Sequence, residues 1–225
     1  MPATLANIAW KPVTGGTGNE GASVTQTDGH EDVLELLSQD VAHYDLRVVK
    51  DYAKVGSLIE AIKARGDKVV LTSGSFDLLH QGHSMYLEAA RQLGDFLVVG
   101  VDSDEKIRRR KGVTRPAVPE DERLRMVTHQ RGVGLVALKN ADDERWALIR
   151  AVRPDVLVAT EDTYTGEEIA ELESRYCGRV EVLRRMATIS TSARLRLVYL
   201  DLAATLADRL PAFIREVVGE MAGSR

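Results

Sequence analysis

Two histidines near the middle of the chain, His80 and His83, have the spacing that most directly suggests chemistry. They lie in the segment Gly74-Ser-Phe-Asp-Leu-Leu-His-Gln-Gly-His83, between an apolar run and a segment with helical periodicity. Side chains three positions apart can face one ligand at a helix start, where free amides and the helix dipole attract anions. Small residues such as Gly74 and Ser75 let backbone amides approach a phosphate closely. The segment therefore predicts a phosphate-binding site.

Nucleotidyl transfer is a reaction that such a site can support. An acceptor phosphate attacks an α-phosphorus in line and pyrophosphate leaves, so the reaction needs positioning and donors aimed at the developing charge. The histidine pair taken alone also fits helix capping or a solvent-exposed surface, and a zinc site is a third alternative. Zinc usually takes three or four ligands, and only Asp77 is nearby. We therefore expect no resident metal site.

Composition places the chain among ordinary globular proteins. Its 225 residues are 44% hydrophobic, which suffices for one buried domain with extensions. The net charge of −4 argues against a dedicated nucleic-acid-binding protein. Cys177, the single cysteine, excludes an intrachain disulfide and favours a cytoplasmic setting. We expect neither a membrane span nor a secretory signal, because there is no apolar run of about 18 residues and no basic-then-apolar start.

Strand-like and helix-like segments alternate through the middle of the chain. The apolar runs predict strands over 68–72, 96–101, 134–138, 156–159 and 180–183. Helical periodicity predicts helices over 33–41, 54–65, 84–93, 120–129, 144–152 and 167–175. This alternation predicts an α/β fold, a Rossmann-like parallel sheet with helices on both faces. Such a sheet binds ligands beyond the carboxyl ends of its strands, where the strand order reverses.

The ends of the chain differ from this core. We predict a flexible tail over 1–30, a helical lead-in over 31–66, a nucleotidyltransferase domain over 67–200 and a C-terminal helical extension over 201–225. Gly16-Thr-Gly-Asn-Glu-Gly21 in the tail matches a dinucleotide-loop pattern, but it lacks the preceding strand that such a loop needs. The helical extension is more apolar than a lone surface helix requires. It therefore packs on its own domain or forms a subunit interface.

The histidine segment resembles the signature G-x-F-D-x-x-H-x-G-H of the cytidylyltransferase-like nucleotidyltransferases, with every fixed residue present. The region from about 55 to 195 is similar to the nucleotidyltransferase domain of ADP-heptose synthase, a glycero-manno-heptose 1-phosphate adenylyltransferase. Glycerol-3-phosphate cytidylyltransferase is the nearest alternative. The shared segments are 86–95, 111–116, 119–123, 153–158 and 189–192.

The resemblance implies roles for individual residues. His80, His83 and Lys111 would be catalytic, and Lys111 and Arg115 would bind the acceptor. The implied nucleotide-binding set is Gly74, Ser75, Phe76, His80, Gly82, His83, Arg123, Ser190, Thr191 and Ser192. The last three would open a helix that binds the β- and γ-phosphates. Mg²⁺ would accompany ATP or CTP, held mostly by phosphate oxygens and water, and the protein would be a homodimer.

The basic run over 106–111 has two interpretations in sequence. It is a solvated basic face, or it is a phosphate-binding loop between a strand end and Gly112. A nucleic-acid contact at this run is disfavoured by the near-neutral charge elsewhere in the chain.

Three segments depart from the family pattern. Ala159-Thr-Glu-Asp162 lacks the expected Lys and Gly, Arg131-Gly-Val-Gly134 lacks an acidic residue, and Arg185-Met-Ala-Thr188 lacks a Gly. We expect these segments to lie where the base and the acceptor are selected. The sequence therefore leaves open ATP or CTP as donor and a sugar phosphate or a polyol phosphate as acceptor. A nucleotide-binding module without catalysis is the competing hypothesis.

Overall fold

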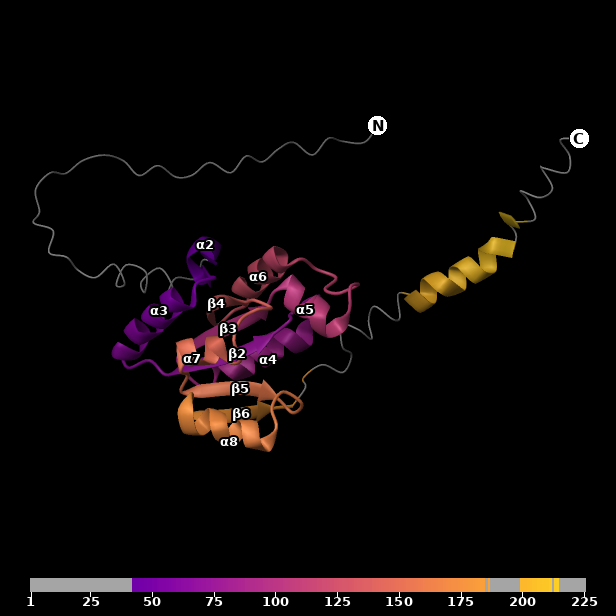
Figure 1. Ribbon diagram of the computed structural model, residues 1–225. Coiled ribbons are helices and arrows are strands. Elements are labelled where there is room, and N and C mark those ends of the chain that lie inside the picture. The colour runs from indigo at the N-terminus through magenta and orange to yellow at the C-terminus, as the bar shows by residue number, and fades with distance from the viewer. Residues whose placement is uncertain (1–41, 185, 187–198, 212, 215–225) are drawn as a thin grey trace, which may run out of the picture.

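A six-stranded parallel sheet forms the centre of the computed structural model, which describes residues 42–184, 186, 199–211 and 213–214. The strands lie in the order β1-β4-β3-β2-β5-β6 (Figure 1). Their bounds are β1 Val48–Val49, β2 Val69–Gly74, β3 Phe96–Asp102, β4 Val133–Lys139, β5 Val156–Thr160 and β6 Arg179–Leu183. The predicted α/β, Rossmann-like architecture is confirmed, and the five predicted strands match β2 to β6 within two residues at each end.

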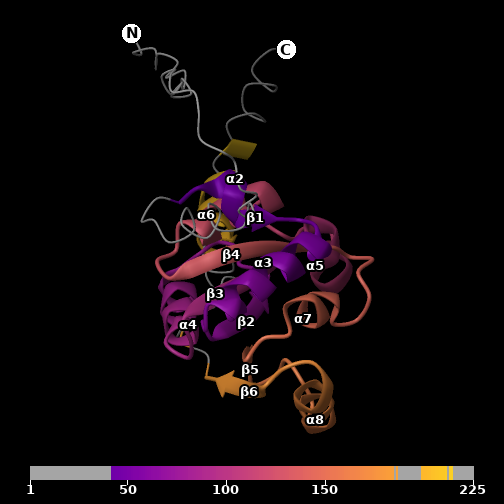
Figure 2. The same ribbon diagram turned by 90° about the vertical axis from the view of Figure 1, so that its left-hand side faces the viewer.

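Helices cover both faces of this sheet. Their bounds are α2 Tyr44–Arg47, α3 Tyr52–Ala64, α4 Gln81–Arg91, α5 Asp104–Lys111, α6 Glu120–Thr128, α7 Ala147–Val152 and α8 Gly166–Arg175. Side chains of α3, α7 and α8 belong to one buried apolar cluster, and side chains of α4 and α6 belong to a second. Figure 2 shows α3 and α7 in front of the strands, on the face opposite α4.

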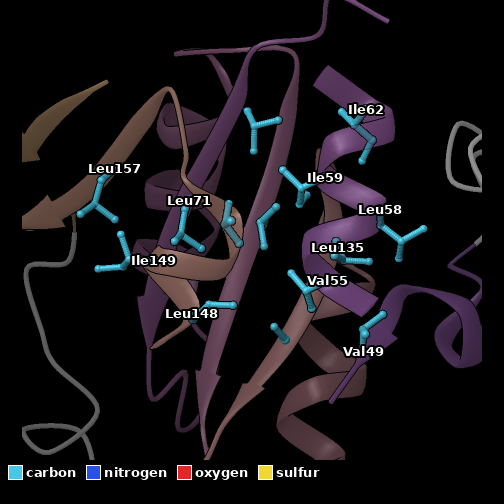
Figure 3. Close-up of a cluster of buried hydrophobic side chains, with 14 of the residues drawn as sticks. Val49, Val55, Leu58, Ile59, Ile62, Leu71, Leu135, Leu148, Ile149 and Leu157 are labelled. Atoms are coloured by element: carbon cyan, nitrogen blue, oxygen red, sulfur yellow. The ribbon is translucent and has the colours of Figure 1, made fainter. Parts of the chain in front are cut away.

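The strands read as continuous apolar runs because both of their faces are buried. Val69 and Leu71 of β2 point into the first cluster, while Val70 between them points into the second. In the first cluster, Val55 and Ile59 on α3 point toward the strands (Figure 3). This double burial fixes the register of β2 and so the position at which the histidine segment leaves the sheet.

Residues 104–111 form α5, so this basic run is not a loop, as the second of its two interpretations supposed; phosphate binding by the run stays a prediction. Ser103 caps the helix by accepting the amide of Lys106 at 3.2 Å. Acidic residues occupy the first turn and basic residues the last, which complements the helix dipole. Ile107 is fully buried and anchors the helix to the domain. The run of charges therefore conceals a short amphipathic helix.

The strand order reverses at β2, which pairs with β3 on one side and β5 on the other. The carboxyl ends of these parallel strands lie at one edge of the sheet, and the histidine segment follows β2 directly. This edge contains the switch point, the position at which open α/β sheets bind ligands.

Residues 199–211 and 213–214, which include the described part of the extension predicted over 201–225, are helical (Figure 1). Their large apolar side chains do not pack against the sheet, so packing on their own domain is wrong for them. They are Tyr199, Leu200, Leu202, Leu206, Leu210, Phe213 and Ile214, and each is 51% to 66% exposed. The predicted tail and the residues Ser190, Thr191 and Ser192 lie outside the described residues. Among the described helices, none is long and apolar enough to cross a membrane.

Candidate active site

The loop between β2 and α4 holds the two histidines in a constrained backbone. Phe76 and Leu78 have φ values of 48° and 51°, in the left-handed region that non-glycine residues rarely adopt. Such strain concentrates at functional sites. The Phe76 ring is buried in the second apolar cluster, and a Cβ on Gly74 would lie 3.2 Å from it. Gly74 therefore leaves space for the Phe76 ring, and the burial of that ring in the second cluster attaches the loop to the domain.

His80 is the N-cap of α4 and accepts the amide of Gly82 at Nδ1, 3.1 Å away. An imidazole that accepts at Nδ1 carries its proton on Nε2, so His80 can donate from that atom. The same bond occupies the amide of Gly82, which the sequence assigned to the nucleotide. The His80 side chain, rather than that amide, is therefore the donor placed at this helix start.

The ring of His83 stacks on that of His80, with centroids 4.1 Å apart. Burial, followed by the charges of His80 and Lys111, lowers the pKa of His83 to about 4, against the opposing effect of Asp77. Its Nδ1 atom is buried and has no hydrogen-bond partner among the described residues. The site thus contains a neutral imidazole with unused hydrogen-bonding capacity beside the start of α4, where the sequence predicts phosphate binding.

Two cations from α5 reach the same residue of the histidine loop. Lys111 Nζ lies 3.1 Å from Ser75 Oγ, and Arg110 Nη2 lies 3.2 Å from that oxygen. Burial and then the neighbouring charge of Arg110 lower the pKa of Lys111. The structure thus brings Lys111 to the predicted site, together with Arg110, which the sequence analysis did not single out.

Arg115 contacts the histidine loop through Asp77. Its Nη1 donates to Asp77 Oδ2 at 2.8 Å, and the amides of Ala117 and Val118 donate to the same carboxylate. Both charged side chains are largely buried, at 15% and 6% exposure. Arg115 therefore ties the segment after α5 to the histidine loop, and its contact with an acceptor stays a prediction.

Arg123 is 1% exposed and binds three separate segments. Its guanidinium donates to the carbonyls of Ser75 at 2.6 Å and Val118 at 2.9 Å, and to Asp104 at 2.7 Å. The bond to the Ser75 carbonyl holds the backbone of the histidine loop in place. Arg123 is therefore a support of the site in this structure, and direct contact with a nucleotide stays a prediction.

The departure at Gly134 does not lie at the site. Gly134 is the second residue of β4, at the amino end of the strand, whereas the histidines follow the carboxyl ends. A Cβ there would lie 2.5 Å from the Phe96 ring. The expectation that this departure affects base or acceptor selection is wrong, because the glycine accommodates an aromatic ring. Ala159 and Thr160, by contrast, end β5 at the site edge.

The family model described as Cytidylyltransferase-like matches residues 71–198, which include both histidines, α5 and Arg123. The chain belongs to this family. It therefore carries a nucleotidyltransferase domain. The match also includes Ser190, Thr191 and Ser192.

Relatives agree with this assignment. The chain is 38% identical over 183 residues to the bifunctional protein HldE of Syntrophotalea carbinolica, covering 80% of this chain and 36% of that protein. It is 42% identical over 162 residues to HldE of Pelobacter propionicus, covering 71% and 32%. The chain thus spans about a third of the length of the curated relatives it matches.

A solved structure is also similar. The lipopolysaccharide core biosynthesis protein of Thermoplasma volcanium is 32% identical, with a TM-score of 0.44, over 53% of this chain and 97% of that one.

Proposed function

We propose that this nucleotidyltransferase moves an NMP group from ATP or CTP to the phosphate of a sugar phosphate or polyol phosphate. An acceptor phosphate oxygen forms a bond to the α-phosphorus, the bond from that phosphorus to the bridging oxygen breaks, and pyrophosphate leaves. The observation that carries the proposal is the stacked histidine pair at the start of α4, with Lys111 and Arg110 bonded to Ser75 of the same loop and the charge of Lys111 acting on His83.

The two histidines have distinct proposed roles. His80 donates from Nε2 to a phosphate oxygen, because its Nδ1 is occupied by Gly82. His83 is neutral in the unliganded protein, and the negative charge of a triphosphate favours its protonated form. Donors preorganised in this way stabilise the charge that develops on the phosphoryl oxygens.

Mg²⁺ is proposed to enter with the triphosphate. Mg²⁺ prefers oxygen ligands, but the carboxylate of Asp77 is taken by Arg115 and two amides, and Asp102 is buried against Arg110. The described site residues therefore do not form a cradle of their own for this ion. Phosphate oxygens and water would hold it, and its charge would neutralise part of the triphosphate.

A heptose 1-phosphate is the acceptor we propose first, with ATP as donor, and glycerol 3-phosphate with CTP is the alternative. The resemblance to the adenylyltransferase domain of ADP-heptose synthase supports the first, and the HldE relatives agree with it. Ala159 and Thr160, at the end of β5, depart from the heptose-type pattern and support glycerol 3-phosphate with CTP as the alternative. The single cysteine, Cys177, supports a reducing cytoplasmic setting for either reaction.

The deciding experiment is an assay of pyrophosphate release with Mg²⁺. ATP and CTP are each tested against sugar 1-phosphates and polyol phosphates, including heptose 1-phosphate and glycerol 3-phosphate. Release with one pair supports the proposal and names both substrates. Binding of ATP without release across the panel would instead support a nucleotide-binding module without catalysis.

A homodimer is proposed through the exposed apolar helix over 199–211 and 213–214, because apolar side chains at helical spacing are stable in water when another surface covers them. Light scattering tests this assembly. A dimer that becomes a monomer in Leu206→Glu supports it, and a monomeric wild-type chain contradicts it.

A further inference from the structure

The four basic residues at the end of α5 divide into two pairs. Arg108 and Arg109 lie on the outer side, where both bond to Glu105 and Arg109 also bonds to Asp142. Arg110 and Lys111 follow the buried Ile107 by three and four positions, so they share its face of the helix. The inner pair is thereby directed toward the histidine loop.

Arg110 and Lys111 converge on one neutral oxygen, the hydroxyl of Ser75. Two like charges held within hydrogen-bonding distance of one atom repel each other; the carboxylate of Asp102 offsets one charge at Arg110, and the hydroxyl offsets none. A phosphate monoester carries up to two negative charges and several acceptor oxygens, so it relieves this repulsion when it binds. The arrangement therefore has the chemistry of a phosphate clamp.

Asp102 holds the Arg110 half of this clamp in place. Asp102 is the last residue of β3, and its side chain is 2% exposed. Its Oδ2 atom lies 2.8 Å from Arg110 Nη2. Its other oxygen lies 3.5 Å from Nζ of Lys139, the residue beside it at the end of β4. Burial favours the neutral acid, but Lys139 and Arg110 outweigh it and lower the pKa of Asp102. A buried carboxylate thus stays ionised and fixes Arg110.

The clamp lies on the β3 side of β2, away from the switch point. The switch point lies between β2 and β5, whereas α5 follows β3 on the other side of β2. In-line attack requires the acceptor and the leaving pyrophosphate to lie on opposite sides of the α-phosphorus. A cationic clamp on the β3 side therefore suits the acceptor phosphate.

We propose that Arg110 binds the acceptor phosphate together with Lys111, and that Asp102, itself held by Lys139, is the positioning residue for Arg110. This assignment rests on the proposed transferase function. Arg110 remains 53% exposed while it bonds to Asp102, so a bound phosphate can reach the guanidinium. A guanidinium has five N–H donors, which suffice for a carboxylate and a phosphate at once.

The test compares Arg110→Gln and Asp102→Asn with Arg109→Gln, a matched change on the outer side of the same helix. Steady-state rates are measured with the donor and acceptor pair that releases pyrophosphate. Arg110→Gln is expected to raise the acceptor KM about tenfold or more, because it removes a charge-assisted hydrogen bond. The nucleotide KM is expected to stay within about twofold of the wild-type value. Arg110→Lys restores part of the loss, and Arg109→Gln behaves as wild type.

Asp102→Asn is expected to raise the acceptor KM by less than Arg110→Gln does, with little change in kcat. An unchanged acceptor KM in Arg110→Gln, or an equal rise in the nucleotide KM, overturns the proposal. Thermal unfolding accompanies each assay, and if Asp102→Asn unfolds, the half-exposed Arg110 variants still decide the question.

Calorimetric titration with inorganic phosphate separates failure of the clamp from failure of the transferase function. If no pair releases pyrophosphate, weaker phosphate binding in Arg110→Gln with wild-type ATP binding supports the clamp alone. Equal phosphate binding in Arg110→Gln and wild type overturns it whatever the assay shows.

Discussion

The imidazoles of His80 and His83 lie in stacked contact, with their planes 24° from parallel. Two protonated rings at this separation repel, and the lowered pKa of His83 reflects that repulsion in addition to burial. The pair therefore begins the reaction cycle with at most one charge. In the proposed reaction, we expect triphosphate binding to change the charge of this pair, next to the phosphoryl oxygens that it stabilises.

We expect His83→Ala to lower kcat by about 10²- to 10³-fold, since it removes a preorganised donor to the phosphoryl group. The fold is expected to persist, because His83 Nδ1 makes no hydrogen bond to the described residues. Pyrophosphate release and circular dichroism measure the two effects. His129→Ala is the matched control, because His129 follows α6 at the amino edge of the sheet and is exposed. Wild-type turnover in His83→Ala contradicts a catalytic role.

The pH dependence of stability follows from the same residue. His83 has a pKa of about 4 in the folded chain and about 6.5 in the unfolded chain. Between these values the unfolded chain binds a proton that the folded chain does not, so the free energy of unfolding falls as pH falls from about 6.5 to about 4. Urea unfolding at several pH values measures this slope. His83→Gln cannot titrate and is expected to flatten it.

Nucleotide binding is expected to raise the His83 pKa, because phosphate charge favours the imidazolium form. Titration of the imidazole by nuclear magnetic resonance, with and without ATP, tests this shift. An unchanged pKa in the presence of saturating ATP would place the triphosphate away from His83.

The bond between Asp77 and Arg115 is expected to contribute to stability as well as to the shape of the site. Removal of one partner from a largely buried ion pair costs about 3 kcal/mol, so we expect Asp77→Ala to lower the free energy of unfolding by about that amount. Asp121→Ala is the control, because its pair with Lys50 is exposed and is worth about 0.5 kcal/mol. If both variants lower the free energy of unfolding by the same amount, the ion pair of Asp77 stabilises the fold no more than an exposed pair does.

Much of the sheet is predictable because strands buried on both faces leave an apolar run in the sequence. β1 is not predictable in this way, because it has only two residues, Val48 and Val49. Its partners in β4 lie 88 residues further along the sequence. The reason is different for α5, because Ile107 is its only buried residue. A pattern of one apolar side chain among seven charged ones shows no periodicity.

The histidine pair is predictable because it belongs to a local signature over residues 74–83, and Lys111 because it opens the shared segment 111–116. The position of Arg123 is not, since its burial depends on Ser75 and Asp104, which lie 48 and 19 positions away. Arg110 is an intermediate case. Once Ser103 is recognised as a helix cap, the spacing of Arg110 from Ile107 places it on the inner face. The sequence therefore contains that signal, but only if α5 is first read as a helix.

Gly134 offers a test of the distinction between stability and specificity. A Cβ at this position would lie 2.5 Å from the Phe96 ring, which must move or tilt to accommodate it. We expect Gly134→Ala to lower the free energy of unfolding by about 1 to 3 kcal/mol, the usual cost of overpacking. The KM values for ATP and acceptor are expected to stay at wild-type levels, because Gly134 lies at the amino end of β4. Gly166→Ala is the control, since nothing lies within 4 Å of its added Cβ. A changed preference between ATP and CTP in folded Gly134→Ala would instead tie this edge of the sheet to base selection.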